Sequence, residues 1–123
     1  MKKILIIEDN DDIRECTAEI LDLEGYNVTT ANCGEQAITQ VALSVPNLII
    51  CDIVMPGMNG YEVLGILRKN ERTQFIPFIF STAKSEPIDK QRAQNLGVNN
   101  YLIKPFDDLE LMNCIRQTLS LVK

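Results

Sequence analysis

Residues Asn47 to Gly60, NLIICDIVMPGMNG, decide the fold, because an apolar run here delivers a single carboxylate into a turn. The run Leu48 to Cys51 has the length and composition of a buried strand, and Asp52 follows it directly. Met55 to Gly60 then supply the proline, glycine and asparagine that are typical of a turn. Since burying an unpaired charge is costly, we expect Asp52 to be paired, to cap a helix or to take part in chemistry.

The composition predicts one compact domain. At 123 residues and 46% hydrophobic, the chain can bury a sizeable core but has no room for a second domain. Twelve basic against seventeen acidic residues give a net charge of -5 with no long basic run, which argues against direct nucleic-acid binding. No apolar stretch approaches the roughly 20 residues of a membrane span, so we expect a cytoplasmic protein with no membrane contact.

The cysteines and the absence of histidine limit the possible chemistry. Four cysteines are scattered through the chain without paired spacing, at Cys16, Cys33, Cys51 and Cys114. This pattern predicts neither disulfides nor a zinc site, and we expect buried or semi-buried small hydrophobes. The sequence has no histidine, which removes the commonest general base.

Short apolar runs alternate with helical patterns along the chain. The runs predict strands over Lys3 to Ile7 and about residues 26–30, 47–51, 75–81 and 100–103. Apolar spacing, glycine and proline predict helices from Ile13 to Leu21 with Gly25 as cap, about 33–43 and 61–69, from Ser85 and Pro87 to Gly97, and after Asp107. We expect one apolar stripe on the last helix, formed by Leu109, Met112, Ile115, Leu119 and Val122.

Pairs of polar residues three positions apart predict where four of these helices begin. The pairs are Asp12 with Glu15, Asn32 with Glu35, Asn59 with Glu62, and Asp107 with Glu110. Strands that are apolar throughout and alternate with helices predict a parallel sheet covered on both faces. In such sheets the functional crevice lies at the carboxyl ends of the strands.

That rule brings together the polar residues that follow the strands, which are Glu8, Asp9, Asp52, Ser81, Thr82 and Lys104. Three carboxylates in one place repel unless a hard cation shares them, and oxygen ligands of this kind suit Mg²⁺. A lysine and a hydroxyl beside them would stabilise a phosphoryl group in transfer. Asp52 would then be the nucleophile, since carboxylates form acyl phosphates.

The chain resembles a receiver domain of the response regulators of two-component signalling, of the chemotaxis-regulator kind, over nearly its whole length. The resemblance rests on four motifs in order: Glu8-Asp9, the stretch from Asp52 to Gly60, Thr82-Ala83, and Lys104-Pro105-Phe106. It implies an α/β, flavodoxin-like, doubly wound sheet of five parallel strands in the order 2-1-3-4-5, with five helices, in a single receiver domain over residues 1–123. It also implies a proline at 105 that is usually in the cis form.

The resemblance also implies the site. Mg²⁺ would be held by Asp9, Asp52, the backbone carbonyl of Val54 and waters oriented by Glu8. A histidine kinase or histidine phosphotransfer protein would donate a phosphoryl group to Asp52, and Thr82 and Lys104 would contact its oxygens. Tyr101 occupies the position of the family's aromatic switch and would turn inward as Thr82 moves, which changes the surface from the fourth to the fifth helix.

Three alternatives stay open. A haloacid-dehalogenase-type enzyme needs a second aspartate two residues after the first, where this chain has Val54, so turnover should be slow and the aspartyl phosphate long-lived. A flavin-binding flavodoxin-like protein would need a phosphate loop after the first strand, where residues 8–12 are acidic. A receiver-like module could also bind partners without phosphorylation.

The output of the domain is not encoded in these motifs. We expect either a free-standing regulator that acts through an unidentified downstream protein or one domain cut from a larger protein. A phosphorylation-dependent homodimer through the surface from the fourth to the fifth helix is a further expectation.

Overall fold

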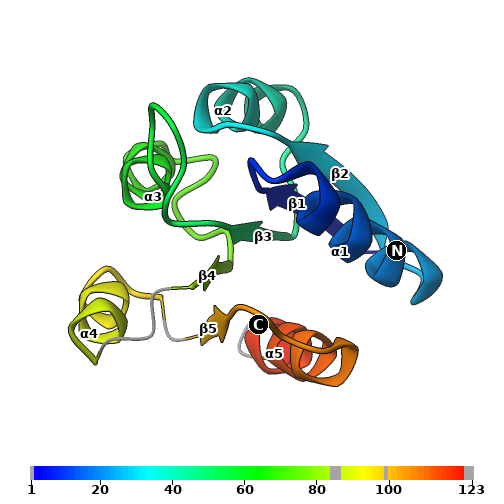
Figure 1. The fold of residues 1–123 in the computed structure, drawn as a ribbon. Helices are drawn as coiled ribbons and strands as arrows, with labels where there is room; N and C mark the ends of the chain where they lie inside the picture. The colour runs from blue at the N-terminus through cyan, green and yellow to red at the C-terminus, as the bar shows by residue number, and fades with distance from the viewer. Residues whose placement is uncertain (1, 84–86, 99, 121–123) are drawn as a thin grey trace.

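The computed structural model describes residues 2–83, 87–98 and 100–120 (Figure 1). Strands and helices alternate along this part of the chain. They are β1 (Lys3–Ile7), α1 (Asp11–Leu23), β2 (Asn27–Ala31), α2 (Gly34–Leu43), β3 (Leu48–Cys51), α3 (Gly60–Arg68), β4 (Phe78–Thr82), α4 (Pro87–Asn95), β5 (Asn100–Ile103) and α5 (Asp108–Ser120).

The strands form one parallel sheet in the order β2-β1-β3-β4-β5. This confirms the doubly wound α/β fold, its strand order and its organisation as a single domain. The chain runs outward from β1 to β2 and then crosses back past β1 to β3, so the switch point of the strand order lies between β1 and β3. The carboxyl ends of β1 and β3 are in register, with Ile7 opposite Cys51.

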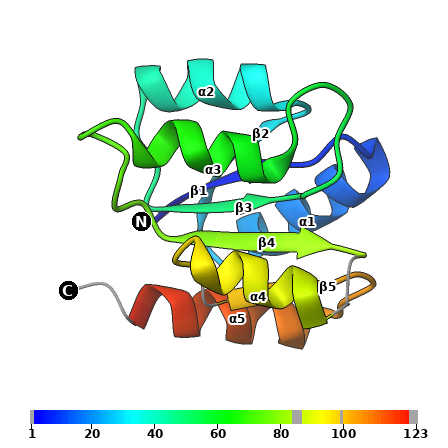
Figure 2. The ribbon, with the colours of Figure 1, turned by 90° about the vertical axis from the view of Figure 1, so that its left-hand side faces the viewer.

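The sheet lies between two layers of helices (Figures 1 and 2). Helices α1 and α5 cover one face, and α2, α3 and α4 cover the other. Because side chains alternate along a strand, Ile4 and Ile6 pack on the α1–α5 side while Leu5 and Ile7 pack on the opposite side. Strands β1, β3 and β4 are therefore buried on both faces, as predicted, whereas the edge strands β2 and β5 are only partly buried.

Two of the four predicted helix starts are confirmed. At α3, the Asn59 side chain accepts from the Glu62 N–H at 2.9 Å, and the Glu62 carboxylate accepts from the Asn59 N–H at 3.1 Å. Asp107 and Glu110 form the same reciprocal pair before α5. The predicted helix ends at Gly25 and Gly97 are also confirmed, since both glycines have positive φ.

The polar pairs predicted to start the other two helices are wrong, although α2 itself begins at Gly34, next to its predicted start. Helix α1 begins earlier, because the Asn10 side chain accepts from the Ile13 N–H at 2.9 Å, so Asp12 lies inside the first turn. Helix α2 has Cys33 at its N-cap without a side-chain cap, and the Asn32 N–H donates instead to the Gln36 side chain at 2.7 Å. Several polar residues lie near the start of each of these helices, and their spacing alone does not predict which side chain caps the helix.

The fourth strand begins later than predicted. It starts at Phe78 because residues 73–76 form a turn in which the Ile76 N–H donates to the Thr73 carbonyl at 3.2 Å. Phe75, which the prediction placed in the strand, is 85% exposed. An aromatic residue before a proline therefore gave a false strand signal.

The predicted apolar stripe on α5 is only partly right. Met112 and Ile115 are buried and Leu119 packs against the core, but Leu109 is 66% exposed. The remaining buried positions on this helix are Leu111, Cys114 and Thr118. Ser85, which was predicted to open the fourth helix, and Val122 lie outside the described residues.

The cysteines are free thiols, two of them buried (Cys51 and Cys114), one partly buried (Cys33) and one exposed (Cys16). The expectation of a buried or semi-buried role is therefore wrong for Cys16. None of the helices within residues 2–83, 87–98 and 100–120 combines the length and apolar composition that crossing a bilayer requires.

Candidate functional site at the carboxyl ends of the strands

Backbone hydrogen bonds of the sheet fix the positions of the residues predicted to form the site. At three places one ladder hydrogen bond continues beyond the end of a strand. These bonds are Glu8 N–H to Ala31 O at 3.1 Å, Asp52 N–H to Ile7 O at 2.9 Å, and Lys104 N–H to Thr82 O at 2.9 Å. Residues far apart in the sequence are thus held at one edge of the sheet by the same register that holds the strands.

The structure brings the three predicted carboxylates together. One carboxylate oxygen each from Glu8, Asp9 and Asp52 lies within 4.8 Å of the others. Glu8 and Asp52 are buried, at 3% and 7% exposure, whereas Asp9 is exposed. Two carboxylates of the group are therefore enclosed by protein and the third is open to solvent. All three supply the hard oxygen donors that Mg²⁺ prefers.

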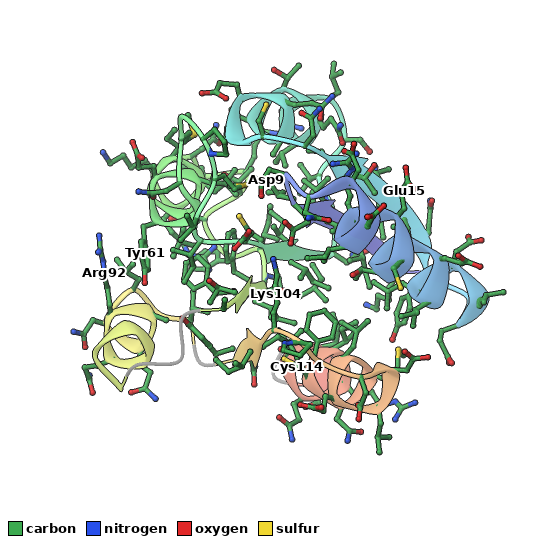
Figure 3. The ribbon with its side chains drawn as sticks, viewed as in Figure 1. Asp9, Glu15, Tyr61, Arg92, Lys104 and Cys114 are labelled. Atoms are coloured by element: carbon green, nitrogen blue, oxygen red, sulfur yellow. The ribbon has the colours of Figure 1, made fainter. Side chains whose placement is uncertain are left out.

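Lys104 partly neutralises this acidic group. Its ammonium forms an ion pair with Glu8 and lies 3.2 Å from Asp52 Oδ2. Figure 3 shows the Lys104 side chain extending from the end of β5 toward the middle of the sheet. Burial raises the pKa of the Glu8 carboxyl, and the hydrogen bond from Lys104 opposes this shift. The Lys104–Pro105 peptide bond is cis, as the resemblance implies.

The turn after Asp52 packs closely against its backbone. The Gly60 N–H donates to the Ile53 carbonyl at 2.9 Å, which folds the start of α3 back over the end of β3. A Cβ at Gly60 would collide with the Asp52 carbonyl oxygen and lie 2.9 Å from the Ile53 Cα. The Val54 N–H approaches Asp52 Oδ1 at 3.4 Å, so the turn also touches the carboxylate itself.

Thr82 and Tyr101 lie on the neighbouring strands β4 and β5. Thr82 is buried at the end of β4, and Ser81 next to it is also buried. Tyr101 is partly buried in β5, with its ring 6.4 Å from that of Phe80. Phe80 in turn makes an edge contact with the Tyr61 ring at 5.2 Å.

Two cations that contact this region were not identified from the sequence. The Arg92 guanidinium of α4 lies over the Tyr61 ring of α3 at 3.9 Å from its centroid, which Figure 3 shows between the two helices. Arg14 of α1 donates to the Glu8 carbonyl. For Arg14 a signal was available, since it is the single basic residue among the acids of residues 8–15. Arg92 gave none, because neither it nor Tyr61 belongs to a motif.

Two grooves lie beside β5 and the loop that follows it. One of about 580 Å³ runs between α1 and the loop after β5, and its apolar lining comes from Ile13, Cys16, Ile20, Ala83, Pro105 and Phe106. Lys104 also lines this groove, which places it directly beside the acidic group. The second, of about 480 Å³, lies among α4, β5 and α5 and includes Tyr101.

The family profile of the response regulator receiver domain matches residues 4–116, which include every residue of the site. The chain belongs to the response regulator receiver domain family. The acidic group, Thr82 and Lys104 are therefore parts of a receiver domain of two-component signalling.

Named relatives and solved structures agree with this assignment. The receiver domain is 40% identical over 119 residues to the transcriptional regulatory protein CpxR of Klebsiella pneumoniae, covering 97% of this chain and 50% of that protein. The chain thus spans about half the length of the CpxR proteins that it matches. It is also 35% identical over 114 residues to an uncharacterised 14.6 kDa protein of Leptolyngbya boryana, covering 93% of this chain and 87% of that protein.

Among solved structures, the Vibrio cholerae chemotaxis protein CheY4 superposes with a TM-score of 0.92 at 30% identity, covering 97% of this receiver domain and 99% of that chain. The chain is therefore also similar to a chemotaxis response regulator.

The close approach at Gly60 predicts the effect of adding one methyl group to the receiver domain. Gly60→Ala should lower the free energy of unfolding by about 2 kcal/mol, because the new Cβ meets backbone that cannot move aside. Gly65→Ala is the matched control, since it lies in the same helix with nothing within 4 Å of its Cβ, and should be neutral or stabilise by up to about 1 kcal/mol. Urea unfolding followed by circular dichroism measures both, and equal effects would show that the contact with Asp52 is not tight.

Proposed function

We propose that this receiver domain accepts a phosphoryl group on Asp52 in a Mg²⁺-dependent reaction and thereby switches a protein-interaction surface. The observation that carries the proposal is the juxtaposition of Glu8, Asp9 and Asp52 with the Lys104 ammonium. Asp52 becomes phosphorylated and slowly loses the phosphoryl group, without turning over a substrate as an enzyme does. The proposed location is cytoplasmic.

The residues present fit a magnesium ion. Asp9 and Asp52 would be direct ligands, the Val54 carbonyl a third, and Glu8 would orient bound waters. The exposed Asp9 leaves room for water in the coordination sphere, which Mg²⁺ keeps in most protein sites. Bound there, the ion would neutralise charge on the phosphoryl oxygens.

The side chains supply the rest of the transfer. A carboxylate oxygen of Asp52 attacks the phosphorus, the N–P bond of the donor's phosphohistidine breaks, and the imidazole leaves with the electron pair and takes a proton. Lys104, 3.2 Å from Asp52 Oδ2, is placed to meet the charge that the phosphoryl group brings. The Thr82 hydroxyl would donate to another phosphoryl oxygen.

The partner that delivers the phosphoryl group is a histidine kinase or a histidine phosphotransfer protein. Its histidine has to reach Asp52, so its surface must cover the neighbouring groove between α1 and the loop after β5, which Lys104 shares. The groove has an apolar floor with Asp12 and Asp108 among its lining residues. The donor surface that fits is therefore apolar with basic residues around it.

The output surface is the face formed by α4, β5 and α5. Thr82 lies at the end of β4, opposite Ile103 in β5, two residues from Tyr101. Movement of Thr82 toward a phosphoryl group would open space for the Tyr101 ring beside Phe80. This change would alter the groove among α4, β5 and α5, where a downstream protein or a second copy of the domain would bind.

Phosphorylation at one residue is the direct test. Incubated with a small acyl phosphate and Mg²⁺, the protein should gain one phosphoryl group by intact mass, and chelation of Mg²⁺ should abolish the gain. Asp52→Asn should not be modified, because its amide is not a nucleophile. Asp12→Asn, an exposed acid outside the acidic group, is the control and should react as the wild type does. An adduct that persists in Asp52→Asn would refute the site.

The lifetime of the phosphoryl group tests the role of Val54. This side chain is 59% exposed and cannot hydrogen-bond an attacking water, so the half-life should be well above a few seconds. Val54→Asn should shorten it roughly fivefold, since one hydrogen bond is worth about 1 kcal/mol in the barrier. Val54→Ala should match the wild type. Decay of the adduct by mass spectrometry gives all three values, and a wild-type half-life of seconds would mean that another residue positions the water.

The docking groove is tested by blocking it at Cys16, in a Cys33→Ser background. Cys16 is exposed, while Cys51 and Cys114 are buried and burial raises the pKa of both thiols, that of Cys114 to about 11, so a bulky maleimide should react at Cys16. Transfer from a phosphorylated histidine donor should slow roughly tenfold or more, as the loss of about 1.4 kcal/mol of docking free energy would cause.

Two controls define the outcome of that experiment. Phosphorylation from a small acyl phosphate should be unaffected by the label, because Asp52 stays accessible to it. The same label on Glu71→Cys, an exposed position beyond the end of α3, in a Cys16→Ser and Cys33→Ser background, should affect neither donor. Normal transfer from the protein donor to the Cys16-labelled domain would place docking elsewhere.

A further inference from the structure

We propose that Arg14 is a positioning residue for the metal-binding side of this site. Its guanidinium Nη1 donates to the Glu8 backbone carbonyl at 2.9 Å, and its Nη2 donates to Asp11 Oδ1 at 2.6 Å. The Arg14 side chain is 15% exposed. One side chain of α1 thus joins the first residue after β1 to the first residue of the helix, and it spans the loop that carries Asp9.

The Glu8 carbonyl is the point at which the chain leaves the sheet. The Glu8 N–H still belongs to the ladder through Ala31, and the Glu8 carboxylate accepts from Lys104 and from the Asn10 N–H. The carbonyl oxygen has turned away from the strands and accepts from Arg14 instead. A charged donor in this place makes a stronger hydrogen bond than a neutral one.

Holding this carbonyl also orients Asp9. The Glu8 carbonyl and the Asp9 nitrogen belong to one planar peptide unit, so fixing the oxygen fixes the direction in which Asp9 leaves the loop. Within residues 2–83, 87–98 and 100–120, the Asp9 carboxylate has no hydrogen-bond or ion-pair partner of its own. Its placement beside Glu8 and Asp52 therefore depends on the backbone that Arg14 holds.

The charge of Arg14 acts in the opposite direction. A cation next to a divalent ion disfavours its binding, so an effect of charge alone would make Mg²⁺ bind more tightly when Arg14 is replaced by a neutral residue. Positioning predicts weaker binding. The ion pair with Asp11 does not decide between them, because Asp11 is 76% exposed and such pairs contribute little. The sign of the change in Mg²⁺ affinity therefore separates the two roles.

Two variants test the proposal, which rests on the proposed function. Arg14→Met removes the charge and keeps the stem, and Arg14→Lys keeps the charge but lacks the planar fork that reaches both partners. In both, the dissociation constant for Mg²⁺, measured by isothermal titration calorimetry on the unphosphorylated protein, should rise about tenfold, as is typical when a group that orients a metal ligand is lost.

A kinetic measurement separates positioning from general loss of structure. The Mg²⁺ concentration for half-maximal phosphorylation by a small acyl phosphate should rise by the same factor, while the rate at saturating Mg²⁺ stays within twofold of wild type. Asp11→Asn is the control, because it removes the exposed ion pair and leaves the hydrogen bond to Glu8, and its Mg²⁺ affinity should stay near that of the wild type.

Each outcome has one meaning. Unchanged or tighter Mg²⁺ binding by Arg14→Met, or wild-type binding by Arg14→Lys, would overturn the positioning role while the proposed function stands. A lower rate at saturating Mg²⁺ in both variants with unchanged Mg²⁺ affinity would also overturn it. If the wild type itself binds no Mg²⁺, the proposed function fails and the role of Arg14 fails with it.

Discussion

The parallel hydrogen-bond register is the constraint on which the rest of this structure depends. In a parallel sheet all carboxyl ends lie at one edge, and here the ladder continues one bond past β1, β3 and β5. These extra bonds determine where Glu8, Asp52 and Lys104 leave the sheet. Since β1, β3 and β4 are buried on both faces, a shift of their register would disturb the packing of the core, and the core therefore holds the site residues in place indirectly.

The acidic residues gathered at this edge are unfavourable for the stability of the domain. Glu8, Asp9 and Asp52 face one ammonium, and two of the three carboxylates are buried. The raised pKa of Glu8 reflects the energy of that burial. Such an arrangement is unfavourable by itself, and a bound cation would relieve the repulsion among the carboxylates.

The sequence was sufficient for the fold and for the residues that the edge brings together. The apolar runs of the sequence predict β1, β3 and β5. Because the carboxyl ends of parallel strands meet at one edge, these strands predict that Asp52 lies near Glu8 and Lys104. What it did not reveal depends on choices among similar local options. Asn10 rather than Asp12 caps α1 because of loop geometry, and Phe75 is exposed because a turn at Thr73 precedes the strand. The contact of Arg92 with Tyr61 joins two helices that share no motif.

Tyrosines are the intrinsic fluorophores of this protein. The sequence contains three tyrosines and no tryptophan. Two of the three, Tyr61 of α3 and Tyr101 of β5, have their rings near that of Phe80. The Arg92 guanidinium lies over the Tyr61 ring. Tyr26 lies on the α1–α5 side of the sheet. Two of the three tyrosine fluorophores of this protein therefore lie on the side where α3 and α4 pack against the sheet, so a change on that side should alter its ultraviolet fluorescence without any attached dye.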